Sequence, residues 1–202
     1  MPRIALTLAA LAAATAASTA AVQAQDLAGV TDGPGPNMVI EVAGADGAPK
    51  GTITLDLYQD KAPNHVARLV QLARSGAYDG VVFHRVIDGF MVQTGDVQHG
   101  KQGGDTAMAG MGGSELPDLD AEFNDVTFGP GTVGMARSQD PNSANSQFFI
   151  DLAPATFLDG QYTVVGQLVD GWDVLNQIKK GDAAANGAVT DPDYMAKVSI
   201  VE

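Results

Sequence analysis

The sequence predicts an all-β fold, a closed barrel with a helix over each end. Three observations lead to this prediction. Short stretches of strand-like composition recur along the chain, turns rich in glycine and proline separate them, and only two segments have the period of an amphipathic helix. Barrels built from many short strands have this pattern.

The first two strands are predicted to form a hairpin. Residues 39–42 begin a strand, and residues 43–50 contain the glycines, the aspartate and the proline of a turn. Residues 51–58 then alternate polar with apolar side chains, which is typical of a half-buried strand. The side chains expected to face inward are Ile53, Leu55 and Leu57.

Two segments have apolar residues at helical spacing. The first is residues 62–75, with Pro63 in its first turn and Gly76 just beyond its end. The second is residues 171–180, which end at Gly181. Proline near the start and glycine after the end are the usual signals of helix boundaries.

The remaining segments complete the barrel. Residues 182–195 are predicted to be a loop, and in one of the later strands Phe148 and Phe149 are expected on opposite faces. These later strands are predicted at residues 128–136, which enter through a turn, and at 146–152, 162–169 and 196–201.

Residues 94–121 are rich in glycine and lack a strand pattern. A phosphate-binding loop is not favoured, because there is no Gly-Lys-Ser or Gly-Lys-Thr sequence and no strand-to-helix context. We interpret the segment as a long mobile loop beside the functional site. Met108 and Met111 could extend an apolar contact surface there, and the sequence leaves this open.

The length of 202 residues suits one domain with a short extra segment. Residues 1–24 have a basic start at Arg3, an apolar centre and small residues before Ala24, which is typical of a secretory signal peptide cleaved after Ala24. An uncleaved membrane anchor is disfavoured, because the apolar centre is shorter than the roughly 20 residues that a span needs. We therefore predict a flexible leader at 25–37 and a domain at 38–202 that is exported and free of the membrane. The periplasm is the expected location, and the sequence leaves release from the cell open.

The charge after cleavage excludes several classes of partner. Loss of Arg3 changes the formal net charge from −13 to −14. Such a surface repels nucleic acid and anionic lipid, so neither is expected as a partner. The chain has no cysteine, which excludes thiol catalysis, thiolate metal sites and disulfides. Its three histidines have no metal-ligand spacing, so no metal site is predicted, and His65 and His99 are interpreted as packing or surface residues.

The chemically informative residues begin in residues 83–96, FHRVIDGFMVQTGD, which start as a strand. Arg85 offers a planar set of donors that stays charged at any ordinary pH. Phe90 and Met91 can wall an apolar slot, and Gln93 can both donate and accept hydrogen bonds. Judged by residue type alone, Arg85 is better explained by a structural ion pair with one of the many acids.

Two further stretches follow the first along the chain: residues 135–150, MARSQDPNSANSQFFI, and residues 157–166, FLDGQYTVVG. With residues 51–85, the three resemble the cyclophilin family of peptidyl-prolyl isomerases, especially its bacterial members. The resemblance covers most of residues 39–180. Within the pattern FHR-x₄-FM-x-Q it favours a catalytic Arg85 over a structural ion pair.

The resemblance implies an eight-stranded antiparallel barrel capped by two helices, with the site on its outer face. It implies that Arg85, Phe90 and Gln93 are catalytic and that proline-containing segments of folding proteins are the substrates. It also implies that no cofactor is needed. The substrate-binding residues that it implies are Met91, Ala136, Arg137, Gln147, Phe149, Phe157, Leu158 and Tyr162. His84 remains equally open as a packing residue or a substrate contact.

The expected chemistry is non-covalent. Rotation about an Xaa-Pro bond loses amide resonance, and it is slow without a catalyst. An isomerase therefore needs a pocket for the proline ring and dipoles that favour the twisted amide. A guanidinium near the imide nitrogen, which regains a lone pair on twisting, would stabilise the transition state more than the ground state.

Some positions depart from the family pattern. Phe157 stands where many eukaryotic members carry Trp, so cyclosporin binding is expected to be weak. Arg137 and Tyr162 replace a frequent Asn and His, and Asp88 replaces a common Pro to which we assign no functional meaning.

Two other functions were weighed. The first is a proline-peptide binding or chaperone module without turnover, which the retention of Arg85, Phe90 and Gln93 disfavours. The second is a serine hydrolase, which fails because there is no G-x-S-x-G sequence and no histidine in a hydrolase context. We predict a monomeric peptidyl-prolyl cis-trans isomerase that assists the folding of exported proteins.

Overall fold

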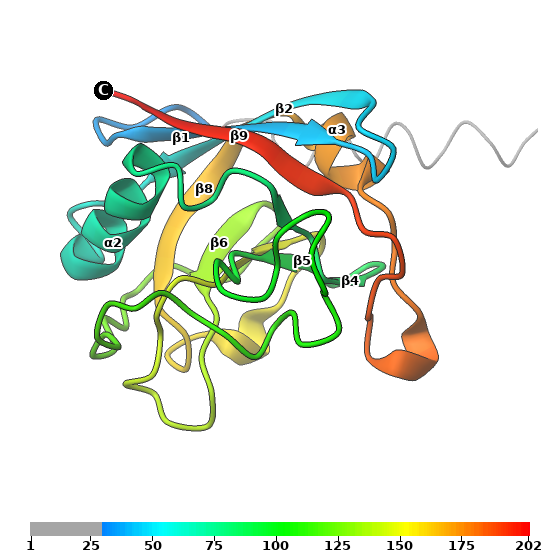
Figure 1. Cartoon of the computed structure of the whole chain (residues 1–202). Helices are drawn as coiled ribbons and strands as arrows, with labels where there is room; N and C mark the ends of the chain where they lie inside the picture. Colours follow the sequence, from blue (N-terminus) through cyan, green and yellow to red (C-terminus); the bar gives the residue numbers. More distant parts are fainter. Residues whose placement is uncertain (1–29) are drawn as a thin grey trace, which may run out of the picture.

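The computed structural model describes residues 30–202, so the predicted signal peptide and the start of the leader lie outside the described residues. The described part consists of one sheet, two α-helices and two short 3₁₀ helices (Figure 1). The strands are β1 (Asn37–Ala43), β2 (Pro49–Leu57), β3 (Val81–Val82), β4 (Arg85–Ile87), β5 (Met91–Thr94), β6 (Thr132–Met135), β7 (Phe148–Asp151), β8 (Val164–Asp170) and β9 (Tyr194–Val201). The helices are α2 (Pro63–Arg74), α3 (Trp172–Gln177), η1 (Thr156–Leu158) and η2 (Ala183–Ala185).

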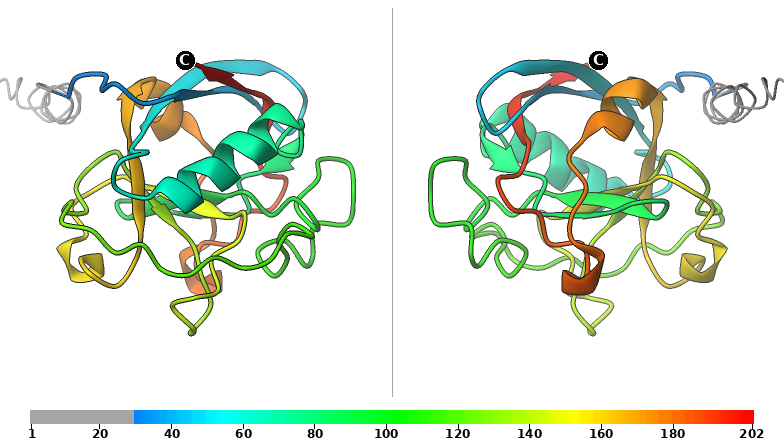
Figure 2. Two further views of the ribbon diagram at one scale, coloured as in Figure 1. Left: turned by 90° about the vertical axis from the view of Figure 1, so that its left-hand side faces the viewer. Right: turned by 90° about the vertical axis from the view of Figure 1, so that its right-hand side faces the viewer.

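The sheet is antiparallel and curls on itself, with α2 and α3 at opposite ends (Figures 1 and 2). Its hydrogen-bonded order is β3-β9-β1-β2-β8-β6-β7-β5-β4. The all-β prediction with two helices is confirmed. The predicted closed ring of eight strands is not confirmed, because nine strands lie in an open order.

The two edge strands, β3 and β4, are consecutive in the chain, and only Phe83 and His84 separate them. The Phe83 N–H donates to the Asp193 carbonyl at 2.9 Å, which continues the β3–β9 pairing by one residue. After His84 the chain pairs with β5 instead, so two consecutive short strands form the two ends of the strand order.

The predicted hairpin is present. β1 pairs with β2, with Ile40 opposite Ile53, and the three side chains predicted to face inward are buried. The helix predicted at 62–75 is α2. Its first N–H groups are capped from a distant loop, because the Glu122 carboxylate accepts from the N–H groups of Asn64 and His65. The same carboxylate lies 2.6 Å from His65 Nδ1, which places this buried histidine in a packing role.

The second helix ends at Gln177, three residues before the predicted end. The reason is that the Lys179 N–H donates to the Asp193 carboxylate at 2.8 Å, and this bond draws the chain away from the helix axis. The last strand correspondingly starts earlier than predicted, at Tyr194.

Apolar side chains form two separate clusters. The main core fills the inside of the curled sheet beneath the helices and includes Phe148. Phe149 belongs to a second, smaller cluster on the other face of β7, as the alternation of strand side chains requires. This second cluster consists of Met91, Phe128, Phe149, Ala155, Leu158 and Val164.

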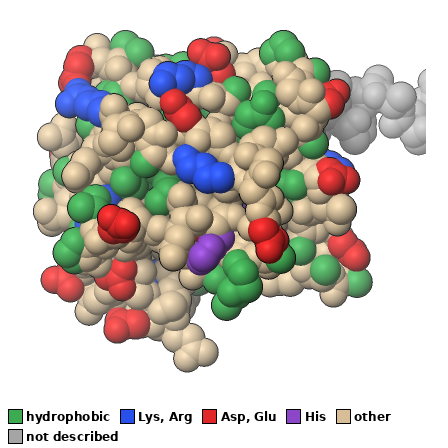
Figure 3. All heavy atoms as spheres, viewed as in Figure 1, with side chains coloured by type: hydrophobic (Ala, Val, Ile, Leu, Met, Phe, Trp, Pro, Cys, Tyr) green, Lys and Arg blue, Asp and Glu red, His purple; other side chains and the backbone are tan. Residues whose placement is uncertain are grey.

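On the face seen in Figure 3, acidic side chains outnumber basic ones and are spread around the rim. This distribution agrees with the 24 acidic and 11 basic residues of the chain. Within residues 30–202, no helix combines the length and the apolar character needed to cross a bilayer.

The close packing of β6 against the second cluster can be tested by adding a methyl group at Gly134. A Cβ atom added to Gly134 would lie 2.5 Å from Phe149 Cζ and 2.7 Å from Phe128 Cε1. We expect Gly134→Ala to lower the free energy of unfolding by about 1–3 kcal/mol, the usual cost of overpacking. Urea denaturation measures it. The control is Gly129→Ala, because nothing lies within 4 Å of its added Cβ; equal stability of both variants would contradict the prediction.

Candidate active site

The hairpin of β4 and β5 positions the central side chains. Its register sets Arg85 opposite Gln93 and Val86 opposite Val92. Val86 and Val92 are fully buried in the main core, so Arg85 and Gln93 project from the opposite, outer face. Gly89 completes the turn with a φ of 69°, a left-handed conformation that favours glycine.

Ten of the eleven predicted site residues surround one hollow of about 310 Å³ on this outer face. Its floor is apolar and buried, formed by Met91, Phe149 and Leu158. Phe157 is 63% exposed at the rim, with its ring centroid 5.7 Å from that of Phe90. The ten residues are Arg85, Phe90, Met91, Gln93, Ala136, Arg137, Phe149, Phe157, Leu158 and Tyr162.

One wall of this slot is built from Tyr162 and Arg137. The Tyr162 ring meets Phe149 edge-on, with centroids 5.8 Å apart. The Arg137 guanidinium lies 4.3 Å from the centroid of the Tyr162 ring, and its Nη2 donates to the Gln161 carbonyl at 2.7 Å. Arg137 is thus held flat against the aromatic wall, an arrangement that suits a lining residue.

Arg85 lies at the edge of the apolar slot with neutral partners. Its Nη1 donates to Gln93 Oε1 at 3.1 Å and lies 3.7 Å from Met91 Sδ. On the other side, Nε donates to the Asn186 carbonyl at 3.0 Å and Nη2 to Asn186 Oδ1 at 3.1 Å. None of the ion pairs among residues 30–202 includes Arg85, so the structural ion pair considered from residue type is not found there.

Burial lowers the pKa of Arg85, and the nearby Tyr162 opposes this effect. The ordinary pKa of a guanidinium is so high that the group remains protonated at neutral pH. The slot therefore has two guanidinium groups, Arg85 at its edge and Arg137 in its wall, and no carboxylate among its described lining residues.

A chain of amides holds Gln93. Its Nε2 donates to Gln147 Oε1 at 3.0 Å, and Gln147 Nε2 donates to the Gly112 carbonyl at 2.8 Å. Gln147, the eleventh predicted residue, lines an adjoining hollow of about 390 Å³ together with Ala136 and Arg137. Each amide therefore has a fixed orientation, which leaves the Gln93 carbonyl directed at Arg85.

The glycine-rich loop that carries Gly112 is organised by Asp96, which is fully buried. Burial disfavours the carboxylate, but hydrogen bonds from four backbone N–H groups hold the pKa of Asp96 below its usual value. Those N–H groups belong to Gln98, His99, Gly110 and Gly112, at 2.8–3.0 Å. The loop lies beside the site as predicted, and Met111, 75% exposed, borders the hollows on both sides of Gln93.

Two other titratable side chains lie close to the slot. Burial lowers the pKa of His84 to about 4, so its imidazole is neutral at pH 7. Gly110 packs on this ring, since an added Cβ would lie 3.0 Å from it. Asp151 is the strand partner of Met91, and burial raises its pKa to about 8. At neutral pH these two side chains are therefore largely uncharged.

Sequence reasoning missed three residues that support the site: Asp96, Gly112 and Asn186. Each acts through a contact that connects distant parts of the chain. The only local signal was the Asn186-Gly187 pair, which indicates a turn and says nothing about its neighbours.

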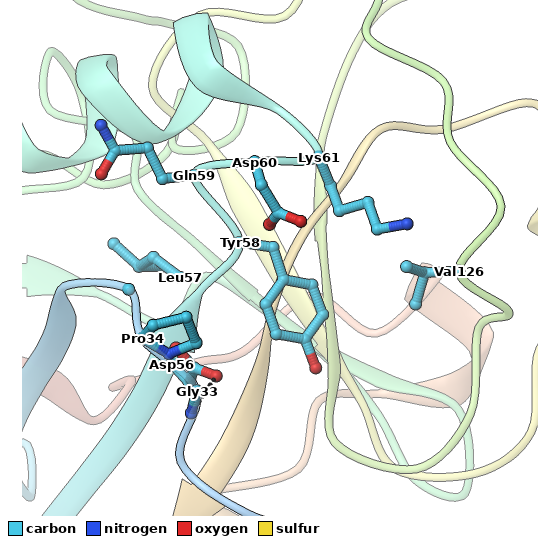
Figure 4. A pocket seen from close by; sticks show the side chains of 10 residues that line it. Gly33, Pro34, Asp56, Leu57, Tyr58, Gln59, Asp60, Lys61 and Val126 are labelled. Carbon is cyan, nitrogen blue, oxygen red and sulfur yellow. Dashed lines mark hydrogen bonds between the residues drawn. The ribbon is translucent and has the colours of Figure 1, made fainter.

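Another hollow, of about 650 Å³, lies away from these two, where the end of the leader meets β2 (Figure 4). It is lined by Pro34, Tyr58 and Asp60 among others, and none of the predicted site residues borders it. Its one lysine, Lys61, forms an ion pair with Asp125 at 2.7 Å. Unlike the slot, this hollow has no cationic side chain outside an ion pair among the described residues that line it.

Comparison with known proteins agrees with the geometry. A family model described as "Cyclophilin type peptidyl-prolyl cis-trans isomerase/CLD" matches residues 38–200. A probable peptidyl-prolyl cis-trans isomerase of Brucella suis biovar 1 is 58% identical over 152 residues, which are 74% of this chain and 78% of the relative. The peptidyl-prolyl cis-trans isomerase-like 1 of Aspergillus fumigatus is 34% identical over 75% of this chain and 91% of its own.

Solved structures show the same fold. The crystal structure of cyclophilin AquaCyp293 from Hirschia baltica has a TM-score of 0.66 at 25% identity and covers 90% of this chain and 80% of its own. A cyclophilin-type isomerase of Cryptosporidium parvum, determined in the presence of the dipeptide Ala-Pro, has a TM-score of 0.68 at 25% identity. That match covers 82% of this chain and 99% of the Cryptosporidium parvum chain.

The role of Asp96 in the loop can be tested by Asp96→Asn. An amide cannot accept from four N–H groups, so we expect a loss of about 1–3 kcal/mol in unfolding free energy at pH 7. The contribution of the carboxylate is present above the pKa of about 3.9 of an unfolded aspartate. It is lost as pH falls through the lower folded-state pKa, so the two proteins should converge in strong acid.

Urea denaturation at pH 7 and at low pH measures this difference. The matched control is Asp105→Asn in the same loop, because Asp105 is exposed and accepts from one N–H group, that of Ala107. We expect the control to stay within about 0.5 kcal/mol of the native protein. If the loss of unfolding free energy in Asp96→Asn does not change with pH, the proposed role of the Asp96 carboxylate is wrong.

Proposed function

The chain belongs to the cyclophilin family of peptidyl-prolyl cis-trans isomerases, and we propose that Arg85 provides its catalysis by stabilising the twisted imide of an Xaa-Pro bond. The observation that carries this proposal is the guanidinium at the edge of an apolar slot, held only by neutral acceptors. The enzyme forms and breaks no covalent bond, so no nucleophile, metal or cofactor is required of the site.

The slot suits a proline ring. A pyrrolidine ring is apolar, and the floor formed by Met91, Phe149 and Leu158 gives it an apolar surface to pack against. The exposed Phe157 closes the slot from the solvent side, next to Phe90. The presence of Ala-Pro in the related Cryptosporidium parvum structure supports proline-containing peptides as ligands of such a slot.

The catalytic step follows from the geometry. A planar imide nitrogen is a poor acceptor, because its lone pair is shared with the carbonyl. As the bond twists, the lone pair returns to nitrogen and can accept an N–H of Arg85. This interaction exists mainly in the transition state, which is the condition for faster turnover. Gln93 orients the guanidinium through its carbonyl and can donate to the substrate by exchanging its bond with Gln147.

The adjoining hollow extends the site along the peptide. Ala136, Arg137 and Gln147 border it, and their backbone and amide groups can bind the residues that precede the proline. The hollow is open, so we propose that the enzyme takes extended segments of unfolded chains and not one defined sequence. No nucleic acid partner is proposed, because the chain carries 24 acidic and 11 basic residues.

We further propose that the enzyme acts outside the cytoplasm as a monomer on newly exported proteins, and that it binds cyclosporin weakly. The apolar, alanine-rich residues 1–24 support export. A protein without cysteine does not depend on oxidative folding in such a compartment.

The role of Arg85 is tested by Arg85→Ala. We expect kcat/KM for the cis-to-trans relaxation of an Ala-Pro peptide to fall by about 100- to 1000-fold, as when one preorganised donor is removed from an oxyanion site. The matched control is Arg74→Ala, because Arg74 is an exposed arginine on α2 paired with Glu202. Full activity of a folded Arg85→Ala variant would remove Arg85 from the mechanism.

Export is tested by expressing the full chain in a bacterial host and fractionating the cells. We expect the periplasmic fraction to contain a shortened protein whose first residue is Gln25, identified by intact-mass measurement. An uncut protein in the cytoplasm or the membrane would contradict the proposed signal peptide.

A further inference from the structure

We infer that Asn186 is a positioning residue for catalysis, which fixes the Arg85 guanidinium from the side opposite Gln93. The inference rests on the role proposed above for Arg85. Asn186 lies in residues 182–195, which the sequence predicts to be a loop.

The contact between the two residues is double. Asn186 presents its carbonyl oxygen to Nε at 3.0 Å and its side-chain Oδ1 to Nη2 at 3.1 Å. Two acceptors from one residue meet two donors on one edge of a planar group. Such a paired contact fixes the rotation of the guanidinium as well as its distance.

The backbone of Asn186 is suited to this contact. Its φ is 54°, in the left-handed region that asparagine and glycine adopt more readily than other residues. The residue follows η2 and ends it, so the helix turn and the left-handed residue together bring the carbonyl and the side chain to the same side.

The segment is anchored to the strand that carries Arg85. The Gly181 N–H donates to the Val86 carbonyl at 2.9 Å, and the Val86 N–H donates to the Gly187 carbonyl at 2.8 Å. The Val189 N–H donates to the His84 carbonyl at 3.1 Å. At Gly187 the approach is so close that an added Cβ would lie 2.5 Å from Ile87 Cγ1. The segment that carries Asn186 is therefore fixed against the edge of β4 by backbone hydrogen bonds and close packing.

Counting donors shows the consequence for the substrate. A guanidinium has five N–H donors, one on Nε and two on each Nη. Asn186 takes two, and Gln93 and the Met91 sulfur take the pair on Nη1. One N–H of Nη2 has no partner among the described residues. Asn186 thus selects which donor remains for the imide nitrogen.

The neutrality of Asn186 is also required. An aspartate at this position would keep both acceptors but place a negative charge about 3 Å from the guanidinium. The ion pair would hold Arg85 in place and weaken its field at the imide nitrogen. Position and charge can therefore be separated by two substitutions at one residue.

The experiment compares Asn186→Gly, Asn186→Asp and Arg85→Ala in the same relaxation assay with an Ala-Pro peptide. Asn186→Gly keeps the left-handed backbone and its carbonyl and removes the side chain, and with it Oδ1, the acceptor for Nη2. We expect kcat/KM to fall about tenfold, the value of one charge-assisted hydrogen bond, with peptide affinity and Tm unchanged. We expect Asn186→Asp to lose at least as much. The control is Asp191→Gly, which removes the side chain of the other left-handed non-glycine residue among those described.

A second readout is specific to positioning. In ¹⁵N NMR spectra, exchange between the two Nη resonances of Arg85 reports rotation about the Nε–Cζ bond. We expect this exchange to accelerate in Asn186→Gly and to stay slow in Asn186→Asp. Native activity and slow exchange in Asn186→Gly, with Arg85→Ala inactive, would overturn the inference while preserving the role of Arg85. A tenfold loss of peptide affinity or a lowered Tm in Asn186→Gly would overturn the inference as well. An active Arg85→Ala would instead overturn the proposed mechanism.

Discussion

The register between β4 and β5 is the constraint on which the site depends, because it decides which side chains face the slot. Val86 and Val92 are opposite one another and buried, and this apolar pair fixes the register through the main core. A slip by one residue would turn Arg85 into the core and expose the valines. The same packing that stabilises the sheet therefore sets Arg85 and Gln93 side by side on its outer face.

The electrostatics of the site follow from what surrounds this hairpin. The chain is rich in acids, yet Arg85 is held by amide and carbonyl oxygens and by a thioether. A partly buried cation with neutral partners is less stable than a paired one, since its desolvation is only partly offset. This loss of stability is a usual feature of functional sites, where a group must keep its charge free for the ligand. The neutral His84 and the raised pKa of Asp151 keep competing charges away.

Much of the fold and of the site could be predicted from the sequence, because their signals are local. The alternation in residues 51–58, the proline and glycine that bound α2, and the motif around Arg85 are each contained in one short stretch. All eleven predicted site residues line the slot or the hollow beside it. The division between β3 and β4, the early end of α3 and the grip of Asn186 on Arg85 could not be predicted. Each depends on contacts between residues far apart in the sequence, such as the hydrogen bond from Arg85 to the Asn186 carbonyl.

The position of β1 between β2 and β9 has a consequence for how the protein is made. The hairpin with β2 can form early, but the other edge of β1 stays unpaired until β9, the last strand, is available. An unpaired edge is a site for association with other chains. A chain that emerges from the ribosome with its N-terminus first therefore cannot complete this sheet until β9 has emerged as well.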